Sequence, residues 1–534
     1  MSNIIILLFY NMKRIFKFFK MGITVCLLSV QGAALAQADP FSQIVRYNGI
    51  NGTEVITRAL PNSCQLTCIK SVNGDKTHTF VSYRPSTGDT RRITCNLGAL
   101  FSAAADDYHI KDMYIFDNKC YFCGYYAPSE IEPIYDPFGN ITDATTYGIV
   151  GYFDLFAPPL LPGWTRPDTT ISNPFLDSIY LITIPETDSI MQIVAHHDDV
   201  LSYDMFLMAV GYTSRYPLST CVVELTKPVG TADTYWSLNI VQPTCAKTEE
   251  YMTDIVLTED HVVVASKLPY ADGGIDGDTD PTHYLFRLHE AKRDGFYNTT
   301  VLPSSSASVW QYDVSAYGVG IGCHHIGDPI RLCPLDGNRF CVYYNGERRE
   351  NPMYYGIGSS VLFWMNEARL MEHAARTYLG SHCNAKEAVW LGDSYKTIAL
   401  LRTDTRNYPE GNVIFPTLYP APLTYCACLA QRIQGVNLHS IDCNPATQYL
   451  YIGGTYPGGK LCLGLQDEIH YCDYAPTCLT YDNNYFSLMS PQETTGEYCT
   501  WSVELEDEEK PAQKANLESI SCYKETICAQ EINQ

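Results

Sequence analysis

The stretch Asp112-Met-Tyr-Ile-Phe-Asp-Asn-Lys-Cys-Tyr-Phe-Cys-Gly124 decides the fold of this chain. Two apolar runs flank the polar pair Asp117 and Asn118, a pattern that predicts a β-hairpin. A third apolar run follows at Gly148–Asp154, after a polar segment of its own. Such a unit has apolar faces that it cannot bury alone, so repetition of the unit predicts that its copies stack on one another.

The same strand, turn, strand pattern recurs along the whole chain. Six further copies span Cys64–Tyr83, Ser189–Gly211, Asp254–Ser266, Pro329–Tyr344, Ala388–Leu401 and Leu438–Gly454. Most copies are followed by a third apolar run, as at His283–Leu288, Ser360–Trp364 and Gly459–Leu463. The copies stand roughly fifty to eighty residues apart, a longer repeat than in compact blade families, because loops of unequal length separate the strands.

Seven such units predict an all-β fold. We expect a β-propeller with seven blades, or with six or eight, because short sheets arranged around an axis leave only short, protected edges. An elongated array of β-sandwiches would also fit the pattern, as would two separate all-β domains.

The phrases Tyr121-Phe-Cys-Gly124 and Tyr449-Leu-Tyr-Ile-Gly-Gly454 resemble inner-strand motifs of kelch-like blades. From about Cys64 to Phe486 the chain resembles the β-propeller superfamily, and this resemblance implies a ring of small antiparallel sheets. The chain contains no Trp-Asp dipeptide, and the Gly-Gly doublet typical of kelch blades does not recur from copy to copy of the phrase. We therefore interpret it as a kelch-like propeller of a secreted bacterial type rather than as a member of a particular named family.

Residues 1–38 have the three parts of a secretory signal peptide. The basic region holds Lys13, Arg14, Lys17 and Lys20, the apolar core spans Met21–Val30, and small residues suited to cleavage stand at Ala34-Leu-Ala36 and Ala36-Gln-Ala38. Translation could begin at Met1 or at Met12. The apolar core is well short of the roughly twenty residues that a membrane span needs. We therefore predict a mature chain without a span that is secreted, periplasmic or on the cell surface.

We expect the mature chain to consist of a propeller at 39–500 and an acidic linker with a C-terminal tail at 501–534. The segment Glu504–Lys510 is acidic, and the tail after Pro511 has a helical composition. Without the four basic residues of the signal peptide, 32 Lys and Arg stand against 59 Asp and Glu, a formal charge of −27. This balance argues against nucleic acid as a partner, and we expect a monomer.

Of the 21 cysteines, Cys26 lies in the signal peptide and 20 remain. In an exported chain this number favours disulfides, and we expect at least three. A structural zinc site needs four converging ligands, which a single Cys-x-x-Cys does not supply. Residues three apart on a strand point to opposite faces, so Cys120 and Cys123 should not bond to each other. The pairs with suitable local spacing are Cys64–Cys68, Cys472–Cys478 and Cys522–Cys528.

The segment Asn366–Leu379 is the best candidate helix. Asn366 can cap its first turn, and Gly380 can end it. Leu370 and Ala374 fall on one helical face. Because the segment follows a third strand and precedes a first strand, we expect a short inserted helix that packs on one face of the propeller.

Three short segments carry residues with chemical potential. Asp276, Asp278 and Asp280 alternate as oxygen ligands of calcium often do, so they are candidate calcium ligands, although an acidic flexible loop is the simpler interpretation. His196-His-Asp-Asp199 joins imidazoles to carboxylates, but neighbouring strand residues diverge and a turn explains the run. Gly322-Cys-His-His-Ile-Gly-Asp328 sets a thiol beside imidazoles without a nucleophile motif. We predict no catalytic residue and no cofactor other than this candidate calcium.

These features predict a non-catalytic propeller that binds a protein or a glycan through the loops between its strands. The expected contact regions are the insertions 127–146, 158–173 and 271–282. The first alternative is a propeller glycoside hydrolase or polysaccharide lyase whose acid and base are carboxylates of the central funnel. The second is a viral attachment glycoprotein, a class with Cys-rich propellers, since sequons stand at Asn51, Asn140 and Asn298.

Overall fold

The computed structural model describes β-strands and the turns beside them between residues 42 and 526. Residues 1–41, 156–179, 268–282, 294–307 and 527–534, together with shorter connections, lie outside the described part of the chain. The elements of the described residues are all strands, and the sheets are antiparallel. Within that same part, no helix is long and apolar enough to cross a membrane.

Several four-stranded sheets share one layout, in which strands pair in sequence order. One contains β5 (Ala105–Phe116), β6 (Lys119–Pro128), β9 (Tyr147–Asp154) and β10 (Tyr180–Ile184). The next contains β11 (Ser189–His196), β12 (Tyr203–Tyr212), β13 (Thr220–Pro228) and β14 (Ser237–Pro243). A third contains β15 (Tyr251–Leu257), β16 (His261–Lys267), β17 (His283–Lys292) and β18 (Ser308–Ala316).

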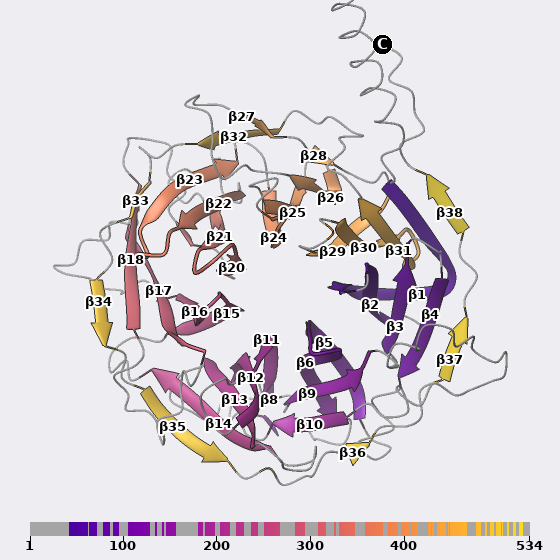
Figure 1. The fold of residues 1–534 in the computed structure, drawn as a ribbon, viewed down its shortest axis with the longest axis horizontal. Helices are drawn as coiled ribbons and strands as arrows, with labels where there is room; N and C mark the ends of the chain where they lie inside the picture. Colours follow the sequence, from indigo (N-terminus) through magenta and orange to yellow (C-terminus); the bar gives the residue numbers. More distant parts are fainter. Residues whose placement is uncertain are drawn as a thin grey trace, which may run out of the picture.

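Two further sheets continue this series. One holds β21 (Phe340–Glu347), β22 (Gly358–Met365) and β23 (Met371–Thr377), with the short β19 (His325–Ile326) and β20 (Arg331–Pro334) both paired to β21. The other holds β24 (Cys383–Trp390), β25 (Ile398–Asp404), β26 (Tyr408–Ile414) and β28 (Ala430–Gln431). A separate small hairpin joins β7 (Ile134–Tyr135) and β8 (Ile141–Asp143). Figure 1 shows the sheets arranged around a common centre, with their first strands innermost.

The first strand, β1 (Ser42–Leu60), pairs on two sides. Its N-terminal part pairs with β31 (Lys460–Gln466), the neighbour of β30 (Tyr449–Tyr456) and β29 (Asn437–Asn444). Its C-terminal part pairs with β2 (Cys64–Ser71), which is followed by β3 (His78–Arg84) and β4 (Asp89–Cys95). One strand therefore connects the sheet near the end of the chain with the sheet at its beginning.

The C-terminal segment adds strands to the outer edges of the sheets, drawn in yellow in Figure 1. They are β32 (Thr477–Tyr481), β33 (Phe486–Leu488), β34 (Gln492–Thr495), β35 (Tyr498–Val503), β36 (Lys510–Pro511), β37 (Asn516–Ser519) and β38 (Tyr523–Thr526). β32 pairs with β23 and with the short β27 (Cys426–Cys428), β33 and β34 with β18, and β35 with β14. β36 then pairs with β10, β37 with β4 and β38 with β1. The segment thus visits the sheets in the reverse of their order in the chain.

Each of the seven strand, turn, strand phrases forms an antiparallel pair, as predicted. In the phrase that begins at Asp112, Phe116 pairs with Lys119 across the turn residues. Asp117 and Asn118 have φ angles of 46° and 59°. A two-residue hairpin turn of this kind needs positive φ at both positions, and Asp and Asn adopt it more readily than most residues with a side chain.

The apolar core lies between neighbouring sheets. Seven clusters of buried side chains each join two sheets that follow one another along the chain or through β1. On β6, Cys120 packs with Phe80 toward β1–β4, whereas Cys123 packs with Ile193 toward β11–β13. The prediction that the two cysteines face opposite ways is confirmed. A strand that is buried on both faces reads as a continuous apolar run, which explains the composition of these phrases.

The helix expected at 366–379 is wrong. Residues 367–369 turn the chain, and β23 then pairs with β22, with Ala374 opposite Phe363. Pairing with β22 on one side and β32 on the other outweighs the modest helix propensity of this segment. The tail after Pro511, expected to be helical in composition, likewise forms β37 and β38.

The disulfide expected between Cys64 and Cys68 is also wrong, since both are buried thiols on β2. Residues four apart on an extended strand lie roughly 13 Å apart, whereas a disulfide needs Cα atoms within about 7 Å. Nine described cysteines are buried thiols, and burial raises the pKa of Cys221, for example, to about 12. They therefore serve as small apolar side chains. The other two expected pairs involve Cys472, Cys522 and Cys528, which lie outside the described residues.

Candidate functional site

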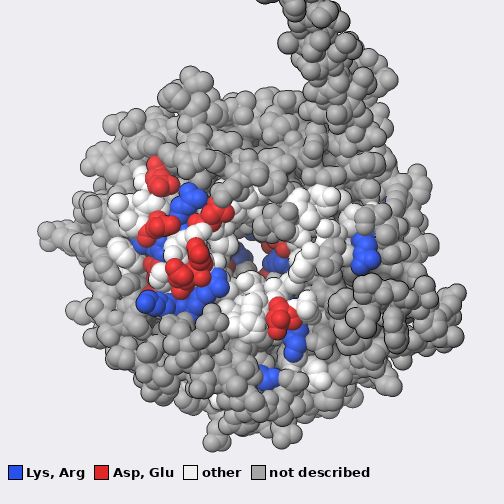
Figure 2. Space-filling model, viewed as in Figure 1, with Lys and Arg blue, Asp and Glu red and all other residues white. Residues whose placement is uncertain are grey.

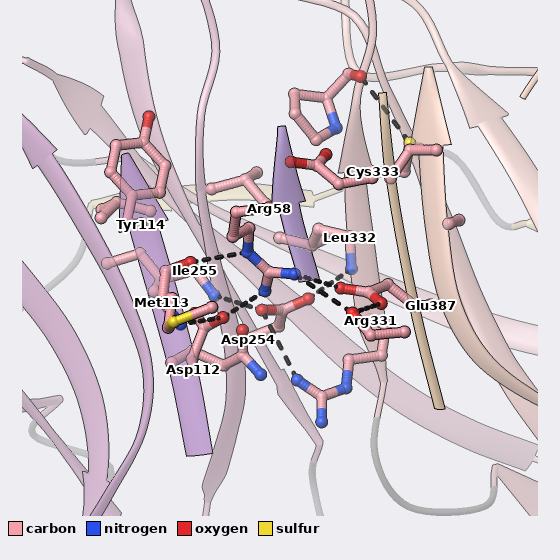
Figure 3. Close-up of a pocket in the computed structure, with 18 of the residues that line it drawn as sticks. Arg58, Asp112, Met113, Tyr114, Asp254, Ile255, Arg331, Leu332, Cys333 and Glu387 are labelled. Atoms are coloured by element: carbon pink, nitrogen blue, oxygen red, sulfur yellow. Dashed lines mark hydrogen bonds and ion pairs between the residues drawn. The ribbon is translucent and has the colours of Figure 1, made fainter. Parts of the chain in front are cut away.

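The first strands of the sheets enclose a cavity of about 590 Å³. Figure 2 shows acidic and basic side chains inside the central opening. The lining comes from β1, β5, β11, β15, β20, β24 and β29, and it includes Arg58, Asp112, Asp254, Glu387 and Asp442. In Figure 3, side chains from several of these strands converge on Arg58. A cavity with converging charged groups is the natural candidate for a binding or active site.

Six of the inner strands contain a β-bulge at a similar position. Their register against the next strand shifts between Thr53 and Val55, Ile110 and Asp112, Ile190 and Gln192, Met252 and Asp254, Ala385 and Glu387, and Leu438 and Ser440. Such a β-bulge leaves backbone groups without a ladder partner and re-aims the side chains beside it. The bulges therefore determine which polar residues reach the cavity.

Carboxylates at two of the bulges link neighbouring sheets. Asp112 Oδ2 accepts a hydrogen bond from Ile193 N of β11 at 3.1 Å, and Asp254 Oδ2 accepts one from Leu332 N of β20 at 2.7 Å. The other oxygen of each side chain accepts the N–H of the residue that follows it, at 2.8 and 2.9 Å. Each carboxylate thus satisfies backbone groups of two strands that would otherwise be buried without a partner.

The same kind of link joins β24, β29 and β1. Glu387 Oε2 accepts hydrogen bonds from Ile441 N at 2.8 Å and from Ser440 Oγ at 2.7 Å. Asp442 Oδ2 accepts one from Ala59 N at 2.7 Å. Carboxylate side chains therefore hold neighbouring inner strands together on several sides of the cavity.

Arg58 lies at the centre of this network (Figure 3). Its guanidinium forms ion pairs with Asp112 and, at 2.8 Å, with Glu387, and it donates to the carbonyl oxygens of Met113 at 2.6 Å and Thr57 at 2.7 Å. Burial alone would lower the pKa of Arg58, but Glu387 and Asp112 raise it. The guanidinium therefore stays charged and offsets part of the negative charge of the two carboxylates.

Two carboxyl groups of the cavity titrate near neutral pH. Burial raises the pKa of Asp254 and of Asp442 to about 6. Arg331 Nη1, 3.9 Å from Asp254 Oδ1, opposes this rise only in part. A perturbed carboxyl in a cavity is a candidate proton donor, although structural networks shift pKa values as well.

The geometry of these two groups favours a structural role. Asp254 accepts the N–H groups of Ile255 and Leu332, one on each oxygen, and Asp442 accepts those of Ala59 and Cys443 in the same way. A general acid or base has to direct a proton or a lone pair at the bound ligand. Here the carboxyl oxygens are directed at the protein backbone instead.

A second polar cluster lies inside the sheet of β15–β18. His289 Nε2 lies 3.0 Å from Ser266 Oγ and 2.6 Å from Glu250 Oε1, and Arg287 donates to Glu250 Oε2 at 3.0 Å. Burial would raise the pKa of Glu250, but His289 and Arg287 lower it to about 2. One imidazole nitrogen contacts both Ser266 and Glu250, whereas a catalytic triad places its serine and its carboxylate on different ring nitrogens. The cluster connects β16 and β17 with Glu250, the residue directly before β15.

The predicted candidate residues are not brought together at the cavity. His196 is buried at the end of β11, with Nδ1 2.9 Å from the carbonyl oxygen of His197. His197 is 49% exposed, and its Nε2 lies 3.7 Å from Asp117 Oδ2. The two imidazoles therefore do not converge on one site. The candidate calcium ligands Asp276, Asp278 and Asp280, the thiol Cys323, and the insertions 158–173 and 271–282 lie outside the described residues.

Sequence reasoning missed the cavity carboxylates, although a signal was present. Asp112 and Asp254 are the first residues of their phrases and stand directly before apolar runs. An acidic residue at the same place in separate copies of a repeat indicates a shared backbone role. Glu387 carries a weaker form of the signal, since it directly precedes the phrase that begins at Ala388.

The fold and the cavity define the class of this protein, an all-β protein whose four-stranded antiparallel sheets are compatible with propeller blades. No protein-family model matches the chain, and no curated protein is similar to it in sequence.

Proposed function

We propose that the chain is a closed seven-bladed β-propeller that is exported and binds a glycan or a protein without catalysing a reaction. The observation that carries this proposal is the commitment of the cavity carboxylates to backbone N–H groups and to Arg58. The cavity is built to hold its shape and to present polar groups to a ligand.

Closure of the ring is supported by β1. In this proposal, Ser42–Arg46 completes the last blade beside β31, and Gly52–Leu60 begins the first blade beside β2. A cluster that includes Val45, Ile69 and Leu461 packs the last blade against the first. Six other clusters pack the remaining neighbours in sequence order. Each blade then has a core on both faces, as a ring requires.

The residues that the structure describes favour a glycan over a protein as the ligand. Protein interfaces centre on large apolar or aromatic anchors, and the exposed large apolar side chains described are Tyr212 and Leu370, neither of which lines the cavity. The cavity instead offers hydroxyl, amide and charged groups, such as Ser440, Gln192 and Lys386. Such groups suit the hydroxyls of a sugar.

A glycoside hydrolase or polysaccharide lyase is the alternative, and one observation favours it. Asp254 and Asp442 have pKa values of about 6, and a glycosidase needs one carboxyl group that stays protonated near neutral pH. Against this reading, the oxygens of both side chains accept backbone N–H groups.

A panel of oligosaccharides and extracellular proteins tests the proposal. The mature chain, with and without calcium, is screened for binding by calorimetry and for turnover by release of reducing ends or unsaturated products. We expect binding without turnover. The opposite result would be turnover that is lost in D254N or D442N, although the variant melts within a few degrees of the parent. That result would overturn the binding proposal in favour of an enzyme.

Export is part of the same proposal and rests on residues 1–38. Expression of the full chain in a bacterial host, followed by N-terminal sequencing of the exported product, should give a mature chain that begins at Gln37 or Asp39. A product that keeps Met12 and stays in the cytosol would contradict export.

A further inference from the structure

One arc of the cavity rim carries a concentration of basic side chains in a chain whose formal charge is −23. The residues at the centre of the bulges on β24, β29, β1 and β5 are Lys386, His439, Glu54 and Lys111. At the same position on β11 and β15 stand the uncharged Met191 and Thr253. At the centre of the bulge, ionisable side chains therefore stand on β24, β29, β1 and β5 but not on β11 or β15.

On this arc, Lys70, His109 and Glu54 form a chain of polar contacts. Lys70 Nζ lies 2.9 Å from His109 Nε2, and His109 Nδ1 lies 3.0 Å from Glu54 Oε2. Burial alone would raise the pKa of Glu54, but the hydrogen bond with His109 and the positive charges of Lys111 and Lys70 lower it. Glu54 is thus ionised and offsets one of the three ammonium groups on the arc.

The backbone of Glu54 is also unusual. Its φ is 54°, in the left-handed region that residues with a side chain rarely adopt. Strain of this kind persists where the surrounding structure enforces it, and it concentrates at functional sites. The bulge on β1 therefore places the one acidic group of the arc among its cations.

The two ammonium groups that line the cavity belong to Lys386 and Lys111. Lys386 Nζ donates to the carbonyl oxygen of Leu438 at 3.3 Å, and Lys111 Nζ lies 5.4 Å from the centre of the Tyr125 ring. Neither lies in an ion pair with a described carboxylate. Both line the cavity together with His439.

The positive charge of Lys386 also affects the imidazole of His439. Burial and the positive charge of Lys386 lower its pKa to about 4, so the ring is neutral at pH 7 and can donate or accept a hydrogen bond. Its Nε2 lies 3.1 Å from Thr455 Oγ1. A bound anion would be stabilised here by two cations and a neutral imidazole at low cost in reorganisation.

We propose that this arc, formed by Lys70, His109, Lys111, Lys386 and His439 around Glu54, is a subsite for one anionic group of the ligand, the carboxylate of an acidic sugar. The inference rests on the proposed binding function and specifies its ligand. Among the carboxylates that line the cavity, Arg58 partly offsets the charge of Asp112 and Glu387, and Arg331 lies 3.9 Å from Asp254. The polar walls accommodate the hydroxyl groups of the sugar.

Titration calorimetry of the mature chain tests the subsite. The probes are trimers of galacturonate, glucuronate and mannuronate, the neutral trimers of the parent hexoses, and a short oligoglutamate peptide. We expect at least one uronate trimer to bind more tightly than its neutral counterpart, with an affinity that falls as salt is added. The variant K111Q/K386Q should lose on the order of tenfold in affinity per lysine.

The matched control is K460Q, a change at an exposed lysine of β31 that does not line the cavity. It should leave the affinity unchanged, and all variants should melt within a few degrees of the parent. Equal binding of neutral and acidic trimers, with no effect of K111Q/K386Q, would overturn the subsite and leave the binding function standing. If the peptide binds more tightly than every uronate, the anionic group that the subsite recognises does not come from a sugar. If no glycan or protein binds at all, the proposed function itself fails.

Discussion

Arg58 brings Asp112 of β5 and Glu387 of β24 to one guanidinium, so a single side chain ties three inner strands together. Replacing Arg58 with Met should lower the free energy of unfolding by about 3 kcal/mol, because the buried Asp112 and the partly buried Glu387 lose their counter-charge. Urea unfolding measures this loss. R58K keeps the charge without the two-pronged geometry and should lose less. An R58M variant as stable as the parent would show that the network makes no net contribution.

The pKa of Asp254 makes stability depend on pH in a defined direction. Its folded value of about 6 lies above the ordinary 3.8, so the folded chain binds this proton more tightly than the unfolded chain. The contribution of Asp254 is therefore full below about pH 4 and is lost as the pH rises to about 6. Relative to D254N, the parent should lose on the order of 2 kcal/mol over this range. Urea unfolding of both proteins at several pH values measures the difference, and a constant difference would contradict the assignment.

At the scale of the element, the hairpin turn of β5 and β6 offers a direct test. Asn118 has a φ of 59°, and glycine adopts this conformation without steric cost. N118G should therefore raise the free energy of unfolding by about 0.5 kcal/mol, whereas N118V should lower it by about 1 to 2 kcal/mol. Thermal melts of the three proteins give the order. Equal melting temperatures would mean that this turn does not limit stability.

The hairpins were predictable because their information is local. Alternating or continuous apolar runs and polar turn residues such as Asp117 and Asn118 encode the pairing within about a dozen residues. The segment that became β23 was misread as a helix because its pairing with β22 and β32 overrides local propensity. The two-sided pairing of β1 was not predicted for the same reason, since its partner β31 lies some four hundred residues away in the chain. The cavity carboxylates depend on the bulges, which local pattern does not specify.

At the scale of the whole molecule, the C-terminal segment covers the edges that separate sheets would leave open. It adds a strand beside β23, β18, β14, β10, β4 and β1 in turn. An uncovered outer strand presents backbone N–H and C=O groups that invite pairing with another chain. The segment links sheets that are far apart in sequence, and we expect it to protect the molecule from association.

Truncation after Pro476 tests this role. The shortened chain should keep a β-rich circular dichroism spectrum, because the clusters between sheets contain almost none of the removed residues. It should, however, associate into oligomers or aggregates that size-exclusion chromatography with light scattering detects.

A chain that ends at Thr526 keeps every tail strand and should remain a monomer. Adding the separate segment 477–534 should restore the monomer if edge pairing is the cause, because its strands need only re-form antiparallel backbone hydrogen bonds. A truncated chain that stays monomeric, with an unchanged melting temperature, would mean that the outer strands of the sheets are protected by their own twist and side chains.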